Sequence, residues 1–155
     1  MKAIERIEQR WLRDEDLQNL TVDQAKTVID TLALVMFADM ETDATEEAAY
    51  DTLTMTLPFG WGEIAELISH SAQASRKAAT CSTAEIQSQI EAAAAAVPEH
   101  VRTQVMGMII AVAVSDKELK DAEAQVLSHF SAAFGFDKAK AQSIYQDTLD
   151  AMGLE

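Results

Sequence analysis

Carboxylate side chains recur in two short stretches of the chain with the same spacing. The first stretch reads Asp-x-Glu-x-x-x-x-Glu from Asp39, and the second repeats this pattern from Asp116. The six acidic residues of the pattern are Asp39, Glu41, Glu46, Asp116, Glu118 and Glu123. Because carboxylate oxygens are hard ligands, such a set favours Ca²⁺, Mg²⁺ or Mn²⁺ over Zn²⁺ or copper.

The spacing excludes an EF-hand loop. That loop carries a bidentate glutamate at its twelfth position, but counting from Asp39 and from Asp116 this position holds Tyr50 and Leu127. The two aspartates instead follow strongly apolar segments that are predicted to be helices. A carboxylate next to the negative end of a helix is unfavourable by up to ~1 kcal/mol, and a bound cation would reverse the sign of that interaction.

Helix capping is the alternative explanation for these acidic residues. Asp43 and Glu46 have the spacing of a capping box, which satisfies free N–H groups at the start of a helix. The second copy lacks this capping box, because Lys120 stands at the position that corresponds to Asp43. The candidate capping residue there is Asp121. The residues alone leave both capping and metal binding open.

The repeat extends to apolar positions on both sides of the acidic loop. When Asp39 is aligned with Asp116, the apolar pairs that match are Val28 with Val105, Leu32 with Ile109, Val35 with Val112, Leu53 with Phe130, and Leu57 with Phe134. Each copy reads as a buried helix, a short acidic loop and an amphipathic helix. These two units span about residues 21–57 and 98–134.

The rest of the chain also shows helical spacing, and no stretch shows the alternation of a strand. Thr21 and Ser82 are predicted to begin helices, Pro98 to open another, and Gly135 to end one. Apolar residues make up 48% of the chain, with only five glycines and two prolines. This composition favours a helical core. The sequence predicts one all-α domain over residues 1–155.

The acidic repeat resembles the TerB-like (tellurite-resistance) family. Members look like two copies of an apolar helix that ends in Ala-Asp-Gly-x-Ile/Val, each followed by a helix with a glutamate. The matching segments here run from Phe37 to Glu41 and from Val114 to Leu119, and residues 130–136 resemble the closing turn of the family. Two departures are Met40 and Lys117, which stand where the family has glycine. The similarity covers about residues 20–150.

This resemblance implies a fold and a function. The fold would be a compact seven-to-eight-helix bundle with two pseudo-symmetric halves, and acidic positions would meet between the halves. The implied function is non-enzymatic divalent-metal binding in tellurite resistance or another chemical stress response. The implied ligands are Asp39, Glu46, Asp116 and Glu123, with Glu41 and Glu118 as weaker candidates.

The charge balance limits the partners. The chain has 26 acidic and 12 basic residues and a net charge of −14. This charge disfavours nucleic acids and anionic membranes and favours cations or a basic protein partner. No Lys or Arg lies between Lys26 and Arg76, an interval that holds the acids Asp30, Asp39, Glu41, Asp43, Glu46, Glu47, Asp51, Glu63 and Glu66. This acidic interval could dock a basic partner without any metal.

Other chemistry finds no support in the sequence. Cys81 is the single cysteine, and His70, His100 and His129 have no neighbouring ligand pattern. No zinc-protease motif, phosphate loop or nucleophile elbow occurs, so we expect a protein that is not an enzyme. Without a signal peptide or a membrane-spanning segment, the expected location is the cytoplasm and direct membrane insertion is not expected.

Overall fold

The computed structural model describes residues 3–36, 44–54, 57, 64–80, 82–115 and 121–154. These residues form helices and contain no strand, which confirms the all-α prediction. The helices are α1 (Ala3–Leu12), α2 (Glu15–Gln18), α3 (Val22–Met36), α4 (Ala44–Thr54), α5 (Ile64–Thr80), α6 (Thr83–Ala96), the 3-10 helix η1 (Glu99–Val101), α7 (Arg102–Ala113), α8 (Asp121–Ala133) and α9 (Lys138–Met152).

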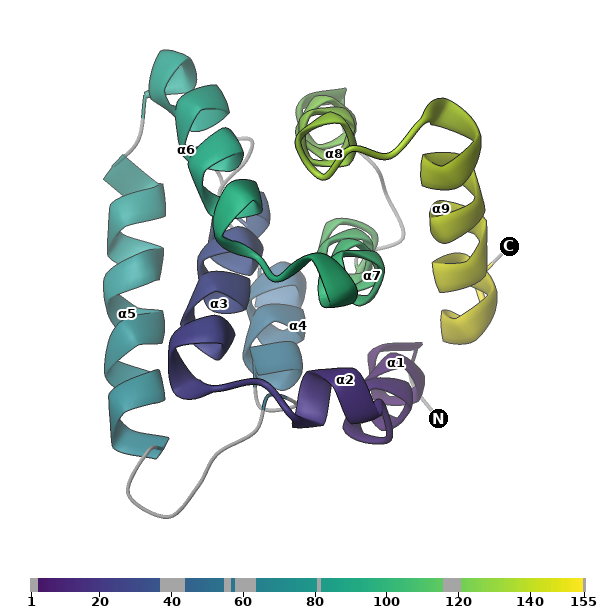
Figure 1. Cartoon of the computed structure of the whole chain (residues 1–155), viewed down its shortest axis with the longest axis horizontal. Coiled ribbons are helices and arrows are strands. Elements are labelled where there is room, and N and C mark those ends of the chain that lie inside the picture. Colours follow the sequence, from purple (N-terminus) through teal and green to yellow (C-terminus); the bar gives the residue numbers. More distant parts are fainter. Residues whose placement is uncertain are drawn as a thin grey trace.

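The helices α3 and α7 form the centre of the molecule and pack against each other (Figure 1). Helices α5 and α6 lie against one side of α3, while α8 and α9 lie against α7. Every residue from Thr31 to Met36 and from Val105 to Ala113 is buried. Burial of each large apolar side chain contributes about 1.5–3 kcal/mol, so these two apolar segments organise the core.

Local signals in the sequence set the helix ends. At the start of α3, the Gln24 N–H donates to Thr21 Oγ1 (3.2 Å) and the Thr21 N–H donates to Gln24 Oε1 (2.9 Å). This pair of bonds is a reciprocal capping box. At the start of α6, the Glu85 N–H donates to Ser82 Oγ. The predicted helix starts at Thr21 and Ser82 are therefore confirmed.

The end of α8 shows why a glycine is needed at position 135. The Phe136 N–H donates to the Ser131 carbonyl (2.9 Å) and the Gly135 N–H donates to the Ala132 carbonyl (3.0 Å). This Schellman arrangement requires a left-handed residue between them. Gly135 supplies it, with a positive backbone angle (φ 83). The predicted stop at Gly135 is confirmed.

The short helix α2 was not predicted. Asp14 caps it, because its Oδ1 accepts from the Leu17 N–H at 3.0 Å. Four residues are too few to show a helical period, so only the capping residue could have indicated this turn.

The helix ends that border the two acidic loops fall at matching positions of the sequence repeat. The alignment of Asp39 with Asp116 places the last residue of α3, Met36, on the last residue of α7, Ala113. It also places the first residue of α4, Ala44, on the first residue of α8, Asp121. All the matched apolar pairs are buried. A pseudo-twofold relation between the halves stays a prediction.

Candidate metal centre and its surroundings

The structure describes only part of the predicted ligand set. Asp39, Glu41, Asp116 and Glu118 lie outside the described residues. Glu46 lies on α4, where the backbone is described and its side chain is not. Within the described part of the chain, no group of three or more His, Cys, Asp or Glu side chains could hold a metal ion. This result leaves the six-residue set untested, because Glu123 is its only member with a described side chain.

Glu123 is buried in the first turn of α8, with 1% of its surface exposed and both carboxylate oxygens out of contact with solvent. Val126, Leu127 and Phe130 follow it at intervals of three, four and seven residues, and all three are buried. Glu123 therefore occupies the first position of the core-facing stripe of α8. The sequence analysis placed Glu123 in the repeated pattern but did not predict its burial, although the spacing of these four residues carried that signal.

The matching stripe on α4 has the same register. Ala49, Tyr50 and Leu53 are buried, and they follow position 46 at intervals of three, four and seven residues. Position 46 is thus the equivalent of position 123 in the helix of the other unit. The two glutamates of the repeat share one register relative to the apolar face of their helices.

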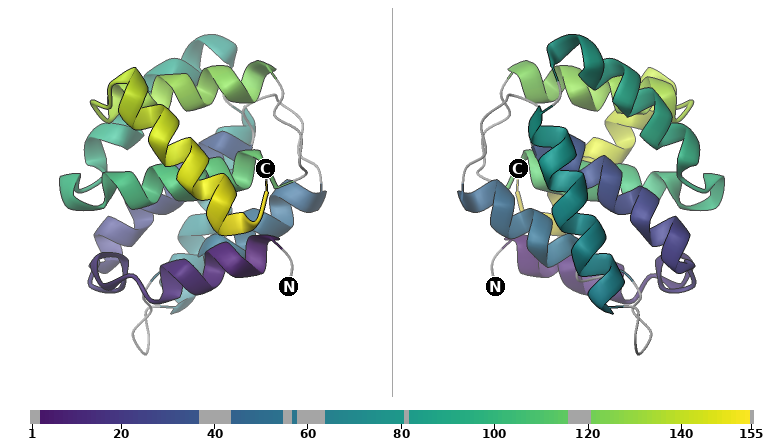
Figure 2. Two further views of the ribbon diagram at one scale, coloured as in Figure 1. Left: turned by 90° about the vertical axis from the view of Figure 1, so that its right-hand side faces the viewer. Right: turned by 90° about the vertical axis from the view of Figure 1, so that its left-hand side faces the viewer.

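The beginning of α4 lies close to the end of α7. Ala44 and Thr45 line a cavity of about 470 Å³ together with Ser115, which follows the last turn of α7. Both views of Figure 2 show α4 and α8 reaching the same side of the molecule. The helix ends that flank the two acidic loops therefore belong to one region of the fold.

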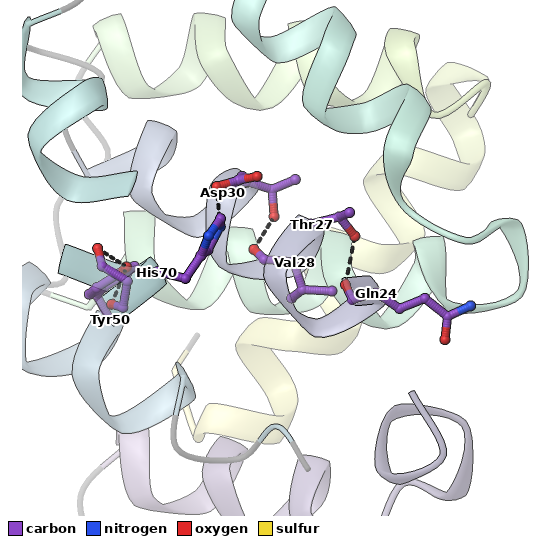
Figure 3. A network of polar contacts seen from close by, with 8 residues as sticks. Gln24, Thr27, Val28, Asp30, Tyr50 and His70 are labelled. Atoms are coloured by element: carbon purple, nitrogen blue, oxygen red, sulfur yellow. Dashed lines mark hydrogen bonds and ion pairs between the residues drawn. The ribbon is translucent and has the colours of Figure 1, made fainter. Parts of the chain in front are cut away.

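A second polar site lies on the surface between α3 and α5. His70 Nε2, on α5, lies 2.9 Å from Asp30 Oδ1, on α3, and both side chains are partly exposed (Figure 3). One residue further along α5, the hydroxyl groups of Ser71 and Tyr50 share a hydrogen bond of 2.6 Å. His70 thus connects α5 to α3, and Ser71 connects α5 to α4.

The acidic interval between Lys26 and Arg76 is partly exposed on α4. Glu47 and Asp51 are exposed and lie four residues apart, so they are neighbours on the helix surface. The pKa of the Asp51 carboxyl group is raised above its ordinary value of 3.8, mainly because the group is partly buried. The negative charge of Glu47 raises it further. Asp30 differs from these two acids because it contacts His70.

None of the helices formed by the described residues combines the length and the apolar character that a membrane span requires.

These observations define an all-helical acidic domain with an internal repeat and a buried glutamate at a repeated position. A family model described as "Tellurite resistance protein TerB" matches residues 25–146, which is most of the chain. The chain therefore belongs to the TerB family, as the resemblance in its acidic repeat predicted. Neither the curated proteins nor the solved structures include a significant match to this chain.

Proposed function

We propose that this protein is a non-enzymatic stress-response protein that binds a hard divalent cation between its two repeated helix–loop–helix units. The burial of Glu123 is the observation that carries this proposal. An ionised carboxylate loses several kcal/mol of hydration when it is buried, and hydrogen bonds, a positive charge or a metal ion offset this loss. A cation bound between the units would contribute to that compensation and would use Glu123 as a ligand.

The register of the repeat supports a matching ligand from the first unit. Position 46 precedes the buried residues Ala49, Tyr50 and Leu53 at the spacing that puts Glu123 on the core face of α8. By the same helical periodicity, Glu46 would begin on the core face of α4. The bound cation would then lie between two glutamates at equivalent positions.

The cavity between the start of α4 and the end of α7 supports a role for the aspartates in this site. Thr45 and Ser115 line one cavity, and the next residues in the chain are Glu46 and Asp116. Asp39 occupies the position equivalent to Asp116 in the first unit, and Glu41 and Glu118 are additional oxygen ligands.

The chemistry of this set favours Ca²⁺, Mg²⁺ or Mn²⁺ over Zn²⁺, because all the ligands are carboxylates. The name of the matching family supports a role in tellurite resistance or in another chemical stress. A cytoplasmic location would fit this role.

Calorimetric titration with Ca²⁺, Mg²⁺, Mn²⁺ and Zn²⁺ tests the proposal. Asp39→Asn and Asp116→Asn should each weaken binding by about tenfold or more, the loss expected for one charged ligand. Glu47→Gln is the matched control, because Glu47 is exposed next to Glu46 on α4. The proposal is wrong if no cation binds at millimolar concentration, or if both aspartate variants bind as tightly as the wild type.

A basic protein partner is the second candidate function, and the exposed pair Glu47 and Asp51 favours it. Like charges four residues apart on a helix repel each other, which contributes to the raised pKa of Asp51. A lysine or arginine of a partner would relieve this repulsion, and the encounter would be accelerated at low salt. Pull-downs at low and high salt test this function, which is wrong if the partner recovered binds equally under both conditions.

A further inference from the structure

A mostly apolar cavity lies between α7, α8 and α9. Helices α8 and α9 both pack on α7 (Figure 1), and the cavity between them has a volume of about 470 Å³, within the usual range for small-molecule sites. It reaches the surface, because Ser128 and Gln142 line it and are exposed. The large apolar and aromatic residues of its lining are Met106, Ile110, Leu127, Phe136 and Tyr145.

The two repeated units differ at this place. In the first unit, the hydroxyl groups of Tyr50 and Ser71 share a hydrogen bond of 2.6 Å that connects α4 to α5. The alignment of the repeat places Leu127 at the position of Tyr50 and Thr148 at the position of Ser71. Leucine has no hydroxyl group, and Thr148 Oγ1 donates to the Ile144 carbonyl of its own helix (2.8 Å). Among the residues that the structure describes, the second unit therefore lacks this polar contact, and the cavity lies between its last two helices.

A buried hydroxyl group in the cavity wall has only a weak hydrogen-bond acceptor among the described residues. Ser131 is 9% exposed, and its Oγ donates to the sulfur of Met106 at 3.9 Å. A thioether is a weak acceptor. The equivalent hydroxyl in the first unit, that of Thr54, donates instead to the Asp51 carbonyl at 2.9 Å. Because Ser131 and Met106 both line the cavity, an oxygen atom of a ligand there would be a stronger acceptor than the sulfur.

The lining favours an aromatic ligand without charge. Phe136 and Tyr145 are partly buried against the core, and aromatic rings pack well against other rings and against a thioether such as that of Met106. Asp137 and Lys138 also line the cavity, but both are exposed and their charges are opposite. No buried charge among the described lining residues would offset the hydration that an ionised ligand loses.

We propose that this cavity binds a small neutral aromatic molecule that carries a hydroxyl group, as a phenol does. Its ring would lie among Met106, Phe136 and Tyr145. Its oxygen would accept a hydrogen bond from the Ser131 hydroxyl. This site is separate from the proposed metal centre, because Glu123 does not line the cavity.

Nuclear magnetic resonance of the full chain, labelled with ¹³C in the methionine methyl groups, tests this proposal. The probe is 4-methylphenol, and each of three related molecules changes one property: toluene lacks the hydroxyl group, 4-methylcyclohexanol lacks the aromatic ring, and 4-methylbenzoate carries a negative charge. We expect 4-methylphenol to shift the Met106 signal in a saturable manner, with a Kd of about 1 mM or below. The other three should bind at least about threefold more weakly. Met108 does not line the cavity, so its signal should shift less, and the variant Met106→Leu assigns the Met106 signal.

A change of volume connects the shift to the cavity. Ala141 lines it, and the first unit has a larger residue, Ile64, at the equivalent position. Ala141→Ile should weaken the binding of 4-methylphenol by about tenfold or more, because the added side chain overlaps with the ligand. Ala139→Ile is the matched control, since Ala139 is exposed in the same first turn of α9 and does not line the cavity. This control should bind as the wild type does, and the same spectra report whether each variant is folded.

The variant Ser131→Ala tests the hydrogen bond. It should weaken the binding of 4-methylphenol by about three- to tenfold, the loss expected for one hydrogen bond, and leave the affinity for toluene unchanged.

Three results would overturn the proposal. The first is the absence of a saturable shift of the Met106 signal with 4-methylphenol up to about 5 mM, several times the expected Kd. The second is binding of any of the three related molecules as tight as that of 4-methylphenol. The third is an unchanged affinity for 4-methylphenol in either Ala141→Ile or Ser131→Ala.

Discussion

The Nε2 atom of His70 lies 2.9 Å from Oδ1 of Asp30, and this contact connects α5 to the central helix α3. The two residues are 40 positions apart in the chain, and α5 packs against α3 along its length. The side chain of His70 is 25% exposed and that of Asp30 is 44% exposed, so solvent screens the pair. Packing against α3 therefore contributes most to the position of α5, and the polar contact adds a small increment of stability.

We predict a measurable but modest coupling between His70 and Asp30. A double-mutant cycle with His70→Ala and Asp30→Ala should give a coupling energy of about 0.2–1 kcal/mol, the range for exposed ion pairs. Urea unfolding of the four proteins measures it. His129 is exposed on α8, so the control His129→Ala should change stability by less than about 0.5 kcal/mol. A coupling energy indistinguishable from zero would show that the contact contributes nothing.

We predict that Gly107→Ala destabilises the protein. The added Cβ would lie 2.9 Å from Trp11 Cζ2, and overpacking of this kind costs about 1–3 kcal/mol. The better helix propensity of alanine offsets about 1 kcal/mol of this, so the net loss should be about 0–2 kcal/mol. Thermal unfolding measures the change.

The clash with the indole ring can be separated from other effects of Gly107→Ala. Phenylalanine at position 11 has a smaller ring, so Gly107→Ala should cost less in a Trp11→Phe background than in the wild type. An equal cost in both backgrounds would mean that Trp11 is not the neighbour that resists the new methyl group.

Much of the fold was predictable because the determining signals are local. The capping residues Thr21 and Ser82 and the stop at Gly135 act within a few residues of themselves. The apolar segments of α3 and α7 are long enough to show that they are buried on all sides. By contrast, α2 has one turn, and its only local signal is the cap at Asp14.

The candidate sites were less predictable because they depend on tertiary contacts. The burial of Glu123 was encoded in its spacing from Val126, Leu127 and Phe130. The close approach of Gly107 to Trp11 and Thr148 had no comparable signal, since these three residues come together only when α1, α7 and α9 pack. No local pattern relates residues that lie this far apart in the chain.

We predict that Asp51→Asn stabilises the protein at neutral pH by about 0.2–0.5 kcal/mol, the cost of one like-charge pair on a helix. Burial and the charge of Glu47 raise the pKa of Asp51 in the folded state. The folded state therefore binds the proton of the Asp51 carboxyl group more tightly than the unfolded state does. The wild type therefore loses stability as pH rises from the unfolded pKa of 3.8 through the folded pKa. The advantage of Asp51→Asn should disappear below that window, where the carboxyl group is protonated in both states.

Urea unfolding at pH 7 and near pH 3 measures both halves of this prediction. Glu47→Gln should give a gain of similar sign at pH 7, and the double variant should gain less than the sum of the two. Full additivity would mean that Glu47 and Asp51 do not repel each other.

The last prediction concerns the response of thermal stability to divalent cations. A ligand that binds only the folded state stabilises it by about 2.7 kcal/mol at a concentration of roughly one hundred times its Kd. For a domain of this size, 1 kcal/mol corresponds to about 2–4 °C, so Ca²⁺, Mg²⁺ or Mn²⁺ should raise the Tm of the wild type by about 5–10 °C. Glu123→Gln keeps the shape of the side chain and removes its charge, so this rise should largely disappear.

Asp121→Asn is the matched control, because Asp121 is exposed in the same first turn of α8, and it should retain most of the rise. Sodium chloride at equal ionic strength controls for general screening of the negative charge. A rise of equal size in Glu123→Gln would exclude Glu123 as a ligand, and no rise with any of the three cations would contradict the proposed metal site.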